Sequence, residues 1–274
     1  MKRSQNNETQ LQRAVSRYFK IIKQQVLTEL EEYWSDYQLV LGQIDLMTRP
    51  IMDSHEQYYS ILEKFIRREF GLGKREAERL VKLSTPQAHK AIRPLRFFHN
   101  RNNLFGTLKD AENDLLSKVF VSSKQTLARV TGDINQIITQ GYTEGKGIDV
   151  VTTMLTTRFN QLETWEAQRI ARTEIHNAHN NAVIKTYDAL GVEYTQWIAA
   201  NDDRTRDSHA ELDGEIIRMG DTYSNGLAYP GDTSGDIEEW VNCRCSNAPY
   251  VMPSDMMAPP GMQQFREEDL IPIS

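Results

Sequence analysis

Apolar residues recur at helical spacing through the first part of the chain. The first stripe runs from Leu11 to Tyr33 in steps of three and four, the period of one helix face. It predicts a long helix from about Thr9 to Leu41, because the first strong breaker is Gly42. Such a stripe either enters a core or docks another chain, and we expect it to form core.

The same spacing predicts further helices, separated by breakers. Pro50 predicts a break, Asp53 or Ser54 could cap the next helix, and the GLG sequence at 71–73 predicts its end. The remaining predicted helices cover residues 74–83, 108–140, 148–159 and 164–190, the last ending at Gly191.

An irregular stretch, residues 84–106, interrupts these helices. It contains HKAIRPLRFFHNR, which mixes histidine, arginine and phenylalanine. Aromatic rings and guanidinium groups stack on nucleic-acid bases, so a nucleic-acid contact is one interpretation. A loop whose Phe97 and Phe98 enter the core is the interpretation that we favour.

After Gly191 the pattern changes to the alternation of short strands. VEYTQWIAA, GEIIRMG and WVNCRCSNAPYV predict three strands joined by polar turns, and the tail after residue 250 holds four of the nine prolines. We therefore predict an α+β protein: a mostly helical N-terminal half with long helices and a small α+β C-terminal domain with a few short strands. The predicted segments are 1–130, 131–250 and a flexible or partner-bound tail, 251–274.

Composition narrows the class of protein. The 274 residues are 39% apolar and 26% charged, and no apolar run approaches the roughly 18 residues needed to cross a bilayer, so we expect no membrane partner. The N-terminus, MKRSQNNETQ, shows no apolar segment of the secretory type. With only two cysteines, we expect a reducing compartment.

Charge is unevenly distributed along the chain. The net charge is +7 over residues 1–130 and −13 over residues 131–274. A basic half can bind double-stranded DNA or an acidic protein surface. Because the basic residues are spread out, we favour a solvated helical surface.

The two cysteines are the first candidates for chemistry. Cys243 and Cys245 are two residues apart, so on a strand both thiols share a face, while a disulfide between them would close a strained ring. They could share a metal ion with His209, and Asp202, Asp203 and Asp232 are weaker candidates. With only three obvious zinc ligands, we expect no cofactor, two buried thiols and a surface histidine, and keep zinc as the alternative.

Other polar clusters are less specific. His176 and His179 lie three residues apart on a predicted helix beside Glu174, and we expect a polar helix face or buried hydrogen-bonding groups. Arg204 and Arg206 alternate with aspartates in a predicted turn, which favours cross-linking of loops. Since no phosphate-binding loop or nucleophile motif occurs, we expect no catalytic residues.

An ordered set of short motifs resembles the phage Mu F-like minor head protein family, also called phage head morphogenesis proteins. The motifs are ARTE at 171–174, Trp197, D-x-R-T-R at 202–206, H-x-x-L-D-G at 209–214, P-G-D at 230–232 and N-C-R-C at 242–245. From them we expect structural roles for Arg172, Glu174, Trp197, Asp202, Arg204, Arg206, Asp213, Gly214, Pro230, Gly231 and Asp232. Some family members carry cysteines at the positions of Arg206 and His209 and a histidine at that of Trp240, which would complete a zinc site.

The resemblance implies a structural component of the virion head, present in the host cytoplasm during assembly. Residues 131–250 would be the head morphogenesis domain, and residues 1–130 the region associated with portal and capsid. Its implied partners are the portal protein and the major capsid or scaffolding protein, and its implied role is head assembly and genome packaging or delivery.

Two alternatives remain open at this stage. One is a degenerate enzyme of ADP-ribosyltransferase or hydrolase type, built on Arg172, Glu174 and the Asp/His cluster. The other is a DNA-binding protein that acts through its basic N-terminal half.

Overall fold

The computed structural model describes residues 2–34, 37–84 and 107–273. The irregular stretch predicted at 84–106, with its candidate nucleic-acid contact, lies almost entirely outside these residues. The chain divides into two compact units: unit 1 comprises Met1–Phe65 and Leu116–Arg172, and unit 2 comprises Ile66–Leu115 and Thr173–Ser274. Within the described residues, no helix is both long and apolar enough to cross a membrane.

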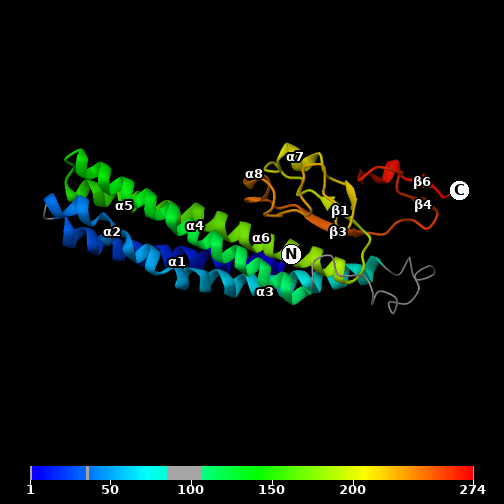
Figure 1. Ribbon diagram of the computed structural model, residues 1–274, viewed down its shortest axis with the longest axis horizontal. Helices are drawn as coiled ribbons and strands as arrows, with labels where there is room; N and C mark the ends of the chain where they lie inside the picture. Colours follow the sequence, from blue (N-terminus) through cyan, green and yellow to red (C-terminus); the bar gives the residue numbers. More distant parts are fainter. Residues whose placement is uncertain (1, 35–36, 85–106, 274) are drawn as a thin grey trace. The chain divides into compact units, whose positions relative to one another are not determined.

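Long helices dominate the described chain, as the sequence predicts (Figure 1). They are α1 (Lys2–Tyr33), α2 (Tyr37–Asp53), α3 (His55–Ser84), α4 (Leu108–Thr143), α5 (Ile148–Gln161), the π-helical turn η2 (Leu162–Glu166) and α6 (Ala167–Ala189). The chain leaves α6 at Gly191, whose φ of 73° is favourable for glycine. There the N–H of Val192 donates to the carbonyl of Tyr187, which is the predicted helix stop.

Unit 1 is a helical bundle in which α1 packs against α2, α5 and η2. The apolar stripe of α1 is buried within this unit, with Leu11, Val15 and Leu30 fully inaccessible, so the expectation that it forms core is confirmed. A network of ion pairs also stabilises the bundle. Glu166 is buried and accepts hydrogen bonds from Arg129 at 2.8 Å and from Arg158, which also pairs with Asp133 at 2.7 Å.

Two predictions about helix ends are wrong. The first helix ends at Tyr33 rather than near Leu41, and Gly42 lies inside α2. Pro50 also lies inside α2, where the lost N–H costs a single hydrogen bond, but the predicted break follows four residues later, at Ser54. Gly71 and Gly73 lie inside α3, which continues to Ser84. A Cβ on Gly73 would stand 2.5 Å from the carbonyl oxygen of His179, so this glycine lets α3 and α6 approach closely in unit 2.

Unit 2 contains a four-stranded antiparallel sheet in the order β3-β1-β2-β5. Its elements are β1 (Tyr194–Ile198), α7 (Asp207–Ala210), β2 (Ile216–Arg218), α8 (Ile237–Trp240), β3 (Ser246–Tyr250) and β5 (Gln264–Phe265). The core on one side gathers Trp197, Leu212, Ile217, Tyr223 and Leu227 around both cysteines. The α+β prediction is thereby confirmed.

The predicted tail is more ordered than the sequence suggests. It forms β4 (Met256–Met257), β5, the 3₁₀ turn η3 (Glu267–Asp269) and β6 (Ile271–Pro272). β5 pairs with β2, Phe265 is buried, and Arg266 donates to the carbonyl of Asp213 at 2.5 Å. Residues 264–266 therefore complete the sheet rather than extend from it. The division of roles among 1–130, 131–250 and 251–274 stays a prediction.

Candidate functional site

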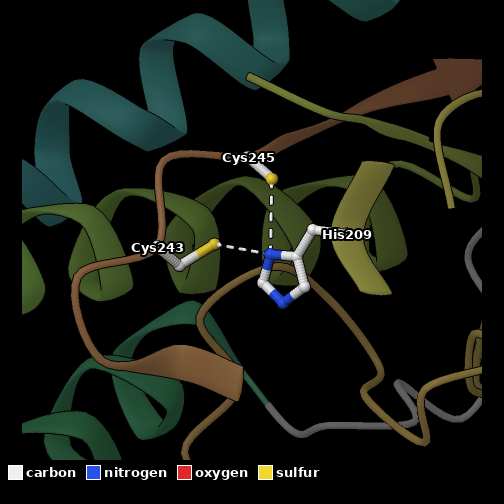
Figure 2. A group of neighbouring side chains, drawn as sticks. All are labelled: His209, Cys243 and Cys245. Carbon is white, nitrogen blue, oxygen red and sulfur yellow. Dashed lines mark hydrogen bonds between the residues drawn. The ribbon is translucent and has the colours of Figure 1, made fainter. Parts of the chain in front are cut away.

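His209, Cys243 and Cys245 converge in unit 2, and their ligand atoms lie within 4.8 Å of one another. Figure 2 shows both sulfur atoms facing the same ring nitrogen: Nδ1 of His209 is 3.6 Å from Sγ of Cys243 and 3.5 Å from Sγ of Cys245. All three side chains are buried, with at most 2% of any of them exposed. His209 is therefore not the surface histidine that we expected.

Two segments of the chain bring these residues together. His209 lies in α7, the short helix that follows β1, whereas both cysteines lie between α8 and β3. The prediction that the cysteines occupy a strand is wrong, because pairing with β1 begins only at Ser246, opposite Ile198. Ahead of the cysteines the chain turns at Asn242, which has a φ of 60° and donates its N–H to Thr173 Oγ1 at 3.0 Å.

The other ring nitrogen of His209 is held by a carboxylate. Nε2 lies 2.9 Å from Oε2 of Glu239, which also accepts from Asn225 at 3.2 Å. A carboxylate at Nε2 favours a proton there, and Nδ1 is the ring nitrogen that faces the two sulfur atoms. Glu239 is thus a component of the site that our sequence reasoning missed.

The two thiols differ in acidity. The hydrogen bond that Cys245 makes with Cys243, together with the nearby His209, lowers the pKa of the Cys245 thiol. The same thiol–thiol hydrogen bond and burial raise the pKa of Cys243. The contact between the two thiols therefore favours ionisation of one of them over ionisation of both.

Trp197 forms one wall of the site. Its ring meets those of His209 and Tyr223 edge to face, at centroid distances of 5.2 and 5.0 Å. The side chain is fully buried, and its Nε1–H has no hydrogen-bond partner within the described structure. The expected structural role of Trp197 is consistent with this packing.

The Asp/Arg turn is attached to the cysteine segment, but through only some of the predicted residues. Arg206 donates to the carbonyl of Val241 at 2.6 Å, and Asp202 pairs with Arg244. Hydrogen bonding from Arg244 lowers the pKa of Asp202 to about 2. Arg204, in contrast, keeps 65% of its side chain exposed beside an exposed Asp203, so its predicted anchoring role is wrong.

Asp213 and Gly214 hold the chain between α7 and β2. Asp213 accepts from the N–H of Ala199 at 2.8 Å and from Asn201 at 2.9 Å. Gly214, with a φ of 82°, donates its N–H to the carbonyl of Trp197 at 3.0 Å. Both motif residues therefore cross-link the ends of the β1–β2 connection.

The P-G-D motif packs on α6. The carbonyl of Pro230 accepts from Asn180 at 2.9 Å, and Gly231, with a φ of 85°, leaves no room for a Cβ beside Asn177. Asp232 is buried and accepts from Ala228 and Ser234, which organises the loop. Asp232 is consequently engaged away from the metal-binding candidates.

The α6 candidates fall into separate environments. Arg172 pairs with Glu8 at 3.3 Å within unit 1. In unit 2, burial raises the pKa of Glu174 to about 7 and lowers that of His176 to about 4. His179 lies 2.8 Å from Glu69, which is fully buried. Neither histidine is among the three grouped ligand residues, although His176 is hydrogen-bonded to the backbone of Cys245.

The region that carries the motifs matches a known protein family. Residues 132–248 match the family model described as Phage Mu protein F like protein. This match covers α6, β1, β2, the first three residues of β3 and the three-residue site, and it confirms the resemblance that the motifs indicate. The similarity to the Phage Mu protein F-like family therefore covers residues 132–248.

Three proteins are similar to parts of the chain. Minor head protein GP7 of Bacillus phage SPP1 is 30% identical over 143 residues, covering 50% of this chain and 45% of that protein. NAD(+)--arginine ADP-ribosyltransferase EFV of Enterococcus faecalis is 25% identical over 206 residues, covering 64% of this chain and 42% of that protein. An uncharacterised protein of Haemophilus influenzae is 30% identical over 109 residues, covering 37% and 23%.

Each match thus spans less than half of the relative's length. No solved structure matches the chain.

Proposed function

We propose that this chain is a minor component of a phage head, associated with the portal protein and with the major capsid or scaffolding protein. The observation that supports this most is the family match over residues 132–248, together with the similarity to a protein named a minor head protein. In this proposal the chain assists head assembly and the packaging or delivery of the genome, first in the host cytoplasm and then in the virion head.

The use of the motif residues favours a structural role. In the described part of unit 2, the carboxylates of Asp202, Asp213 and Asp232 accept hydrogen bonds from the chain itself, and Arg206 donates to a backbone carbonyl. Such contacts fix loops to one another. A catalytic carboxylate instead needs to reach a substrate atom within hydrogen-bond distance.

A portal pull-down tests this function. Tagged chain is recovered from cells in which the phage is being assembled, after nuclease treatment and at high salt, and the bound proteins are identified by mass spectrometry. We expect the portal protein to be retained. Recovery of the chain without portal, capsid or scaffolding protein would contradict the proposal.

Enzymatic activity is the second candidate, favoured by the similarity to the arginine ADP-ribosyltransferase EFV. Incubation of the purified chain with labelled NAD⁺ and arginine-rich acceptor proteins tests it directly. Our proposal predicts no transfer above that of heat-denatured chain. Arginine-linked label would favour the enzyme instead.

DNA binding through the basic residues 1–130 belongs to the same proposal as an accessory property. If it contributes, affinity for double-stranded DNA must fall steeply with salt, because phosphate contacts release condensed counterions. Retention of the portal at salt concentrations that abolish DNA binding would separate the two interactions.

A further inference from the structure

The distances within the cysteine site match those of a zinc centre. Zinc lies about 2.3 Å from a cysteine sulfur and about 2.0–2.1 Å from a histidine nitrogen, so tetrahedral angles place such a sulfur and nitrogen about 3.6 Å apart. The two observed distances from Nδ1 of His209 are 3.6 Å to Cys243 and 3.5 Å to Cys245. Both sulfur–nitrogen distances are therefore those that a shared ion requires, and all three ligand atoms lie within 4.8 Å of one another.

Hydrogen bonding alone accounts for this arrangement less well than a bound metal ion does. A neutral imidazole nitrogen offers a single lone pair, and both sulfur atoms approach the same Nδ1 (Figure 2). With both thiols protonated, two S–H donors would compete for that lone pair, and with a protonated ring the one Nδ1–H would have to serve both sulfur atoms. A cation between the three atoms satisfies all of them at once.

Glu239 supplies the outer partner that such a centre needs. A metal-bound histidine normally donates its other ring N–H to a carboxylate or carbonyl, which fixes the tautomer and the ring orientation. Here Nε2 of His209 is 2.9 Å from Glu239, a residue 30 positions away in the sequence. Glu239 is held in turn by Asn225 at 3.2 Å and Ser208 at 3.4 Å.

We propose that His209 Nδ1, Cys243 Sγ and Cys245 Sγ bind one Zn²⁺, which links α7 to the segment that precedes β3. Both thiols ionise on binding, and their two protons pass to solvent. A water molecule takes the fourth position, because the described residues place only these three ligands together. Thiolate and imidazole ligands suit zinc better than calcium or magnesium.

The neighbouring contacts are consistent with a tether rather than a reacting centre. Arg206 to Val241 and Asp202 to Arg244 join the same two segments that the ion would join. Trp240, which precedes the cysteine segment, donates its indole N–H to the carbonyl of Gly235 at 3.2 Å. This inference is independent of the proposed function.

Elemental analysis tests the proposal on the full chain, purified without a metal-affinity resin. We expect about one zinc per chain, and less than about a tenth of that in the Cys243→Ser/Cys245→Ser variant. Zinc far below one per chain, even after refolding with added zinc, overturns the proposal. An equivalent of copper or iron in place of zinc overturns the assignment of the ion.

A second experiment avoids variants that fail to fold. Glu239→Gln keeps all three ligands and should weaken zinc affinity about 10–100-fold, measured by competition with a chromophoric chelator. Glu238→Gln, an exposed neighbour in α8, is the matched control and should leave the affinity unchanged. Equal affinities in both variants would contradict the role of Glu239.

Cobalt titration of the unmodified chain gives a third readout. Co²⁺ bound by two thiolates should produce a charge-transfer absorption in the near ultraviolet that zinc abolishes. No spectral change on titration of the folded, reduced chain would overturn the proposed ligand set.

Discussion

Nε2 of His209 lies 2.9 Å from Oε2 of Glu239, and this contact directs the opposite ring nitrogen at two buried sulfur atoms. The relationship joins α7 to α8. It fixes the orientation of the imidazole ring, so that Nδ1 faces Cys243 and Cys245.

Metal removal should destabilise unit 2. An ion that binds only the folded state adds about 2.7 kcal/mol to the free energy of unfolding when its free concentration is 100 times its Kd. We therefore expect thermal unfolding to shift upward with zinc and downward with EDTA. The Cys243→Ser/Cys245→Ser variant should show neither shift, and an unmodified chain that is equally insensitive to both would contradict this prediction.

Gly73→Ala should destabilise the chain. The added Cβ would stand 2.5 Å from the carbonyl of His179, and such overpacking outweighs the gain in helix propensity, for a net loss of about 1–2 kcal/mol. Gly71→Ala is the matched control, since its Cβ meets only the end of Arg75 at 3.6 Å. It should stabilise by about 0.5–1 kcal/mol. Urea denaturation measures both, and equal effects would contradict the close approach of α3 and α6.

The two arginines of the Asp/Arg turn should behave differently. Arg206→Ala removes a hydrogen bond to the carbonyl of Val241 and should lower the free energy of unfolding by about 1–2 kcal/mol. Arg204→Ala removes an exposed side chain and should change it by less than about 0.5 kcal/mol. If denaturation curves show Arg204→Ala to be the more damaging substitution, the arrangement of this turn is wrong.

Glu174 should make stability fall as pH rises. Burial raises its pKa to about 7, whereas a glutamate in an unfolded chain ionises near about 4.3. Between these values the unfolded state loses the proton first, so the glutamate destabilises the fold progressively up to pH 7 and fully above it.

Glu174→Gln should remove this dependence. Because the side chain is only partly buried, we expect a gain of about 1–2 kcal/mol at pH 8 and little change at pH 4. Glu211→Gln, at an exposed position, serves as the control. Parallel pH profiles of unfolding free energy for Glu174→Gln and the unmodified chain would refute the prediction.

Sequence patterns predicted the helices well because a 3.6-residue apolar period survives in any bundle. The α1 stripe and the stop at Gly191 are examples, and both are local features. Gly73 shows where this fails. A glycine can end a helix or admit a neighbouring one, and only the contact with His179 decides between the two.

The three residues that meet at the site were candidates from the sequence, but the organisation of the site was not predictable. Cys243 and Cys245 stand out as the two cysteines of the chain, and His209 as a nearby histidine. Glu239 carries no such signal, because it is one of several acidic residues in its segment and meets His209 only through the fold. Arg204 and Arg206 are chemically identical, so their different burial depends on where the cysteine segment passes.

Protein composition of purified phage particles tests the central claim most directly. DNA-filled heads and procapsids of a phage that encodes this chain are separated on a density gradient at high salt and quantified by mass spectrometry. We predict peptides of the chain in one or both particles, in constant ratio to the portal protein across the peak. Particles that contain portal and capsid protein but none of this chain at either stage would contradict its assignment as a minor head protein.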